Sequence, residues 1–160
     1  MKVVANLVTA ATPGAVYDVV SDLGTYPRWL DIVSAARPVP GRDATWDVDL
    51  RAQLGPFRRI KRLRMRRSVA DEPTHVRFER HEEDGRSHSS WVMDARITPA
   101  AGTSGRGNDP DDPDEVDEVE LEVTLNYSGA LWVPMLDRVL SDEIRRSRGR
   151  LAALVAGQAD

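Results

Sequence analysis

The sequence predicts an α+β fold: a curved antiparallel sheet of about six or seven strands wrapped around a long C-terminal helix, with two short helices after the first strand. Two observations predict it. Apolar and polar residues alternate in most segments between residues 46 and 127, which is typical of strands with one buried face. From about residue 134 to 156 the apolar spacing becomes helical. Because a one-sided sheet needs a cover, we expect this last helix to supply it.

The N-terminal part predicts a strand over residues 2–10 and then two short helices. Thr12 suits the N-cap and Pro13 the first helical position of a helix that runs to about residue 23. A second short helix is expected to open at Tyr26 and to turn Trp29, Ile32 and Val33 inward.

The middle of the chain predicts a meander of strands joined by short turns. Alternation marks strands at residues 46–54, 58–69, 75–81, 91–97 and 118–127. Residues 99–115 are rich in glycine, proline and aspartate and lack a large apolar side chain. We expect them to form a mobile acidic loop between two strands. Residues 1–160 are therefore expected to form a single domain.

Composition excludes several classes of site. The chain has no cysteine, so it can form neither a disulfide nor a thiolate zinc site. No apolar run approaches the length of a membrane span, and a strand pattern begins directly at the N-terminus, so we expect a cytoplasmic protein without stable membrane insertion. The net charge of -4 argues against a general nucleic-acid binder.

Three segments carry a resemblance to a known family. Residues 11–13 (Ala-Thr-Pro), 16–22 (Val-Tyr-Asp-Val-Val-Ser-Asp) and 26–29 (Tyr-Pro-Arg-Trp) resemble the START-like or SRPBCC superfamily, also called the Bet v 1-like or helix-grip fold. Within it they are similar to the bacterial polyketide cyclase/dehydrase and lipid-transport branch. Gly129 and Trp132, before the last helix, fit as well. The resemblance covers almost the whole chain except the acidic loop.

The resemblance implies a cavity between the sheet and the C-terminal helix. Members of the family use it for lipids, sterols, polyketides and other hydrophobic molecules. Some catalyse cyclisation or dehydration there, whereas others carry or sense a ligand, and fold analogy alone does not choose between these.

The residues predicted to face inward are unusually aromatic and flexible. They are Trp29, Trp46, Met65, Phe78, Trp91, Met93, Tyr127, Trp132, Met135, Leu136 and Leu140. Large rings and thioethers suit an adaptable apolar pocket, although the same pattern also fits an ordinary packed core.

Four polar residues share this inward face. Arg80 and Lys61 lie on predicted strands, and Glu143 and Ser147 lie in the apolar arc of the last helix. We expect Glu143 and Arg80 to form a polar anchor for a ligand carbonyl, hydroxyl or carboxylate, the alternative being that their long side chains extend to solvent. For Lys61 the solvent-directed interpretation is favoured.

A basic run at residues 58–67 invites a nucleic-acid interpretation, but the predicted sheet favours cross-strand ion pairs on its solvent face. The arginines concerned are Arg62, Arg64 and Arg66, and the neighbouring acidic residues are Asp47, Asp49 and Glu79. The three histidines, His75, His81 and His88, lack a carboxylate spaced to complete a metal site, so we expect no metal.

The leading hypothesis is binding or carriage of a small hydrophobic, lipid- or polyketide-like molecule, by a monomer or homodimer without a cofactor. One alternative is a cyclase, aromatase or dehydratase acting on a polyketide-like substrate, with Glu143, Arg80 or Tyr127 moving protons. The chain lacks an evident nucleophile or acid–base pair at fixed spacing, so no catalytic residue is assigned. A second alternative is a regulatory or interaction protein without a ligand.

Overall fold

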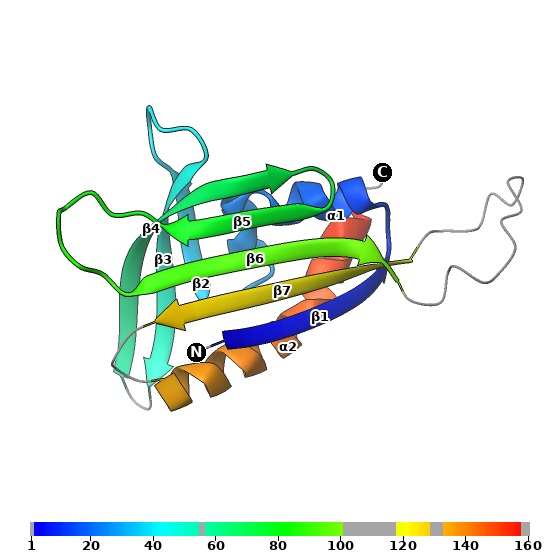
Figure 1. Ribbon diagram of the computed structural model, residues 1–160. Helices are drawn as coiled ribbons and strands as arrows, with labels where there is room; N and C mark the ends of the chain where they lie inside the picture. Colours follow the sequence, from blue (N-terminus) through cyan, green and yellow to red (C-terminus); the bar gives the residue numbers. More distant parts are fainter. Residues whose placement is uncertain (1, 55–56, 101–117, 129–132, 158–160) are drawn as a thin grey trace, which may run out of the picture.

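The computed structural model describes residues 2–54, 57–100, 118–128 and 133–157 (Figure 1). Side chains are described throughout these ranges except at residues 52–54, 57–59, 133–141 and 144. The predicted acidic loop at 99–115 lies almost wholly outside the described residues. The elements are β1 (Lys2–Ala10), α1 (Pro13–Val20), η1 (Leu23–Arg28), β2 (Val33–Pro38), β3 (Thr45–Leu54), β4 (Phe57–Asp71), β5 (His75–Arg80), β6 (Ser90–Pro99), β7 (Glu118–Ser128) and α2 (Val133–Ala156).

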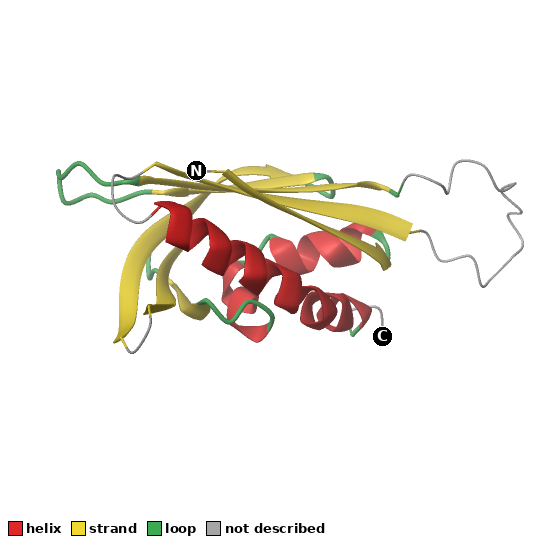
Figure 2. Ribbon diagram, turned by 90° about the horizontal axis from the view of Figure 1, so that it is seen from below, coloured by secondary structure: helices red, strands yellow, loops and turns green. Residues whose placement is uncertain are grey.

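The strands form one antiparallel sheet of seven strands in the order β1-β7-β6-β5-β4-β3-β2. Consecutive strands from β2 to β7 pair with one another, and β1 pairs with β7, so β1 and β2 are the two edge strands. Figure 2 shows the sheet curling at one end toward the helices, which all lie on one face. The α+β class and the curled antiparallel sheet predicted from alternation are therefore confirmed.

The first helix begins where the sequence predicts. The Thr12 hydroxyl accepts a hydrogen bond from the Ala15 amide at 3.2 Å, and Pro13 occupies the first turn. Val16, Val19 and Val20 are fully buried, as their helical spacing requires.

The segment after α1 corrects two expectations. The second short helix is a 3-10 helix that begins at Leu23, not at Tyr26, because the Asp22 carboxylate accepts a hydrogen bond from the Gly24 amide at 2.8 Å and caps it. Val33, expected to belong to that helix, instead begins strand β2. Residues 33–38 lack large alternating apolar side chains, so periodicity gave no sign of a strand there.

Ion pairs across the outer face of the sheet confirm the prediction for Arg62 and Arg64, whereas Arg66 lies opposite Glu79 and forms no ion pair with it. Arg62 lies opposite Asp49 and Arg64 opposite Asp47 in the β3–β4 register. The Arg62 Nε donates to Asp49 Oδ1 at 2.7 Å, and the Arg64 Nε donates to Asp47 Oδ1 at 2.9 Å. These arginine charges are therefore already compensated within the sheet.

The ion pairs of Asp49 with Arg62 and Arg37 make the free energy of unfolding depend on pH. Hydrogen bonds from Arg62 and then Arg37 lower the pKa of Asp49 from 3.8 to about 2. A carboxyl group with a lowered folded-state pKa stabilises the fold above its unfolded pKa, and this contribution is lost as the pH falls through the folded value. We expect the free energy of unfolding to fall between about pH 4 and pH 2, and to fall less in Asp49→Asn.

Chemical denaturation across that pH range measures the effect, with Asp43→Asn at an exposed position as the control. Identical pH slopes in wild type and Asp49→Asn would contradict it.

Candidate functional site: an apolar cavity under the sheet

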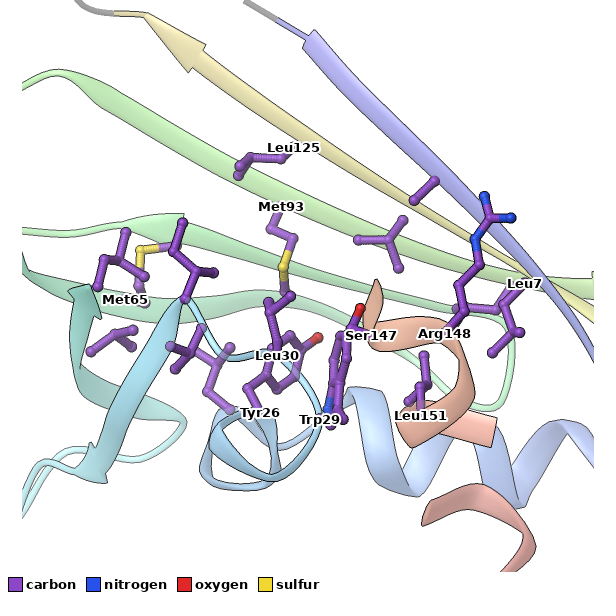
Figure 3. Close-up of a pocket in the computed structure, with 18 of the residues that line it drawn as sticks. Leu7, Tyr26, Trp29, Leu30, Met65, Met93, Leu125, Ser147, Arg148 and Leu151 are labelled. Carbon is purple, nitrogen blue, oxygen red and sulfur yellow. The ribbon is translucent and has the colours of Figure 1, made fainter. Parts of the chain in front are cut away.

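A cavity of about 100 Å³ lies between the concave face of the sheet, the segment from η1 to β2, and α2 (Figure 3). Its wall is almost entirely carbon and sulfur. The sheet contributes Ala5, Asn6, Leu7, Val48, Leu50, Leu63, Met65, Trp91, Met93, Leu121, Val123 and Leu125. The segment after α1 contributes Leu23, Tyr26, Trp29, Leu30, Ile32 and Val33, and α2 contributes Ser147, Arg148 and Leu151.

Several of these apolar wall residues are only partly buried, although they face the inside of the fold. They are Leu7, Leu50, Met93, Val123 and Leu125, which pack against the buried cluster without being enclosed by it. Protein interiors are normally close-packed, so this concave face carries apolar surface that the described part of the chain does not cover.

The structure places five of the predicted site residues at the cavity wall. They are Trp29, Met65, Trp91, Met93 and Ser147. In Figure 3 the Met93 side chain, from β6, points toward Leu30 on the opposite side of the cavity. Two thioethers in the wall give it side chains that can change shape with little strain.

Other predicted aromatic residues pack away from the cavity. The rings of Trp46 and Phe78 meet edge to face at 5.6 Å between centroids, and Tyr26 packs on Phe78 at 6.3 Å. Tyr127 packs beside Trp91, with centroids 4.8 Å apart. Trp46 and Phe78 thus stabilise the core next to the cavity without lining it.

The structure does not bring the predicted anchor residues Arg80 and Glu143 together. The Arg80 Nε donates to Glu82 Oε1 at 3.0 Å, and its Nη1 donates to the Ser89 hydroxyl at 3.2 Å. These contacts hold Arg80 at the start of the β5–β6 connection, and neither Arg80 nor Glu143 lines the apolar cavity.

Glu143 instead connects α2 to the segment just before β2. Its buried Oε1 accepts a hydrogen bond from the Asp31 amide at 2.8 Å. Arg146 and Arg150 each lie 3.4 Å from the Glu143 carboxylate, and Arg150 also donates to Asp31, holding the pKa of that carboxyl below its usual value. We call Glu143, Asp31 and Arg150 the latch.

The latch borders a second, polar cleft of about 530 Å³. Its wall consists of Pro27, Asp31, Ile32, Val33, Ser34, Arg51, Asp142, Glu143 and Arg146. Ile32 and Val33 line both spaces, so this short segment is the partition between the apolar cavity and the cleft.

The predicted residues Trp132, Met135, Leu136 and Leu140 lie outside the residues whose side chains are described. Sequence reasoning missed the contributions of β1 and η1 to the wall. Val4 and Val8, on the outer face of β1, are 47% and 53% exposed. Because β1 has apolar residues on both faces, alternation could not identify Ala5 and Leu7 as the inward positions.

Within residues 2–54, 57–100, 118–128 and 133–157, no cluster of three or more histidine, aspartate or glutamate side chains could hold a metal ion. No helix in the same part of the chain has the length and hydropathy needed to cross a membrane.

Solved structures with the same fold cover nearly the whole chain. A conserved protein from Geobacillus kaustophilus has a TM-score of 0.70 at 12% identity, covering 98% of this chain and 96% of its own. A START superfamily protein from Mycobacterium smegmatis has a TM-score of 0.65 at 16% identity, covering 98% and 97%. The Zhui aromatase/cyclase from Streptomyces sp. R1128 has a TM-score of 0.57 at 14% identity, covering 99% and 93%.

A comparison with curated proteins found no significant match. Among families, the one described as polyketide cyclase / dehydrase and lipid transport matches residues 9–148, which include β2 to β7 and the latch residues Asp31 and Glu143. The chain therefore belongs to the polyketide cyclase / dehydrase and lipid transport family.

Proposed function

We propose that this protein binds and carries a small hydrophobic, lipid- or polyketide-like molecule in the cavity between the sheet and α2. The observation that supports this best is the partly buried apolar wall formed by residues such as Met93, Val123 and Leu125. Covering these side chains with a ligand removes apolar surface from water, which contributes roughly 25 cal/mol per Å² before association costs.

The size of the cavity limits what fits without rearrangement. At about 100 Å³ it is smaller than an engineered apolar cavity of about 150 Å³ that holds benzene. A larger ligand requires Met65 and Met93 to change rotamer, or the partition at Ile32 and Val33 to move. The cavity wall contains both the two methionine side chains and the partition residues Ile32 and Val33.

The contacts of Tyr26, Arg80 and Glu143 favour carriage over cyclase-type chemistry. The buried Tyr26 hydroxyl donates to the Val20 carbonyl at 3.0 Å, Arg80 is paired with Glu82, and Glu143 is committed to the Asp31 amide. A general acid or base must reach the reacting atom, and each of these groups is already engaged elsewhere. The cyclase relative at 14% identity supports the fold and not a shared reaction.

Fluorescence titration with N-phenyl-1-naphthylamine, a neutral apolar probe that brightens in apolar surroundings, tests the proposal. We expect saturable binding of one probe per chain with a Kd of roughly 1–100 µM, from the ligand efficiencies typical of small molecules. Octanol should displace the probe competitively. A linear, unsaturable signal would refute ligand binding in this cavity.

A further inference from the structure

A lysine stands where β4 runs beyond its neighbour β5. β4 has fifteen residues and β5 has six, and their pairing begins only at Met65. Lys61 lies in the part of β4 that is not paired with β5, on the same face as the cavity-lining residues Leu63 and Met65. Its partner across the β3–β4 pair is Leu50, which also lines the cavity.

The Lys61 ammonium reaches over the gap that the short β5 leaves. Its Nζ lies 5.4 Å from the ring centroid of Trp91, on β6, and 5.7 Å from that of Tyr127, on β7. Both distances are within the range of a cation–π contact. Because Trp91 forms part of the cavity wall, the charge is held at the margin of the apolar cavity.

Lys61 forms no ion pair with any carboxylate in the described part of the chain. The nearby Arg80 is paired with Glu82. Partial burial, and then the Arg80 charge, lower the pKa of Lys61, which agrees with an ammonium that lacks a compensating anion. The side chain is nevertheless exposed, so an anion can approach it from solvent.

We propose that Lys61 binds the carboxylate of an amphipathic ligand whose apolar part occupies the cavity. This inference rests on the proposed carriage of a hydrophobic molecule and specifies the ligand class. A carboxylate matches the single uncompensated charge, whereas a phosphomonoester carries more than one negative charge near pH 7. The two rings and the ammonium together hold the charged end at the margin while the chain or ring system lies inside.

The test compares octanoate with octanol as competitors of bound N-phenyl-1-naphthylamine. The quantity measured is the ratio of the two inhibition constants, because both ligands share one apolar part. In Lys61→Met we expect the preference for octanoate to fall by about tenfold or more relative to wild type, as for the loss of a charged hydrogen bond. Lys61→Arg keeps the charge and should retain most of the preference.

Lys2→Met is the matched control, because Lys2 and Lys61 are the only lysines in the chain and Lys2 is exposed on β1. Its ratio should equal that of wild type. An unchanged ratio in Lys61→Met, with probe binding to wild type intact, would overturn the role of Lys61 while leaving the proposed function standing. Failure of the probe to bind wild type would remove the proposed function itself.

Monooctyl phosphate is the third competitor. Stronger displacement by the phosphate than by octanoate, lost in Lys61→Met, would overturn the assignment of a carboxylate. Weaker displacement by the phosphate supports it. Thermal unfolding of each variant verifies that the compared proteins are folded.

Discussion

Replacing Val123 with tryptophan is expected to weaken binding of N-phenyl-1-naphthylamine by about 100-fold or more, because the new ring takes the space of the ligand. Val123 lies on β7 in the cavity wall, and its two cross-strand partners are the small residues Ala5 and Ala95. A large ring can therefore lie over them and extend into the cavity. Overpacking of this kind typically costs about 1–3 kcal/mol, so the variant should still fold.

The control is the same substitution on the other face of the sheet. Val4→Trp, on the neighbouring strand β1, changes a residue that is 47% exposed and points away from the cavity. Its probe affinity should match wild type. Titration and thermal unfolding of both variants decide the matter: wild-type affinity in a folded Val123→Trp protein would place the probe outside the cavity.

Alternation predicted the faces of the sheet because side chains of a strand point alternately to its two sides. On β4, Leu63 and Met65 are buried while Arg62 lies on the outer face and binds Asp49, as predicted. The same logic failed at β2, where alanine, serine and arginine give no alternation to detect. That strand is defined by its pairing with the next strand, β3, and not by the pattern of its own side chains.

Periodicity predicts which face of the sheet a residue is on, but not whether an inward-facing side chain lines the cavity or packs in the core. Trp46 and Met65 are cross-strand partners with the same inward direction, yet only Met65 reaches the cavity wall. The Trp46 ring instead packs edge to face against Phe78 in the core. Sheet curvature and the position of η1 decide such differences, and neither is encoded in local spacing.

The partners of buried charged residues also could not be predicted from the local spacing of residues. The helical arc predicted that Glu143 faces inward, and it is buried, but its partner is the backbone amide of Asp31. Arg80 shares the parity of Phe78, but β5 ends at Arg80, and the following turn supplies Glu82 as its partner. Side-chain identity predicts that a buried charge is paired, while only the fold determines with what.

We expect the contacts of Glu143 in the latch to influence ligand exchange from the proposed cavity. Ile32 and Val33, directly after Asp31, separate the apolar cavity from the polar cleft. The hydrogen bond from the Asp31 amide to Glu143, together with the Arg150 bridge, ties this partition to α2. A ligand that enters through the cleft must displace the partition, so the strength of the latch sets part of the barrier to exchange.

We therefore expect Glu143→Ala to lower the free energy of unfolding by about 1–3 kcal/mol, because it leaves the partly buried Asp31 amide without its acceptor. The same loss should speed dissociation of N-phenyl-1-naphthylamine by about tenfold, which corresponds to about 1.4 kcal/mol of barrier. Glu143→Gln keeps an acceptor for the Asp31 amide but removes the charge, so its effects should be smaller.

Asp142→Ala is the matched control, since Asp142 precedes Glu143 on α2 and borders the same cleft but pairs only with Arg145 among the described residues. Denaturant unfolding and stopped-flow displacement of the probe measure the two effects separately. If Glu143→Ala lost stability without faster release, the ligand would have to exchange by a route that leaves Ile32 and Val33 in place. If it matched Asp142→Ala in both, the contact of Glu143 with Asp31 would not hold the partition at all.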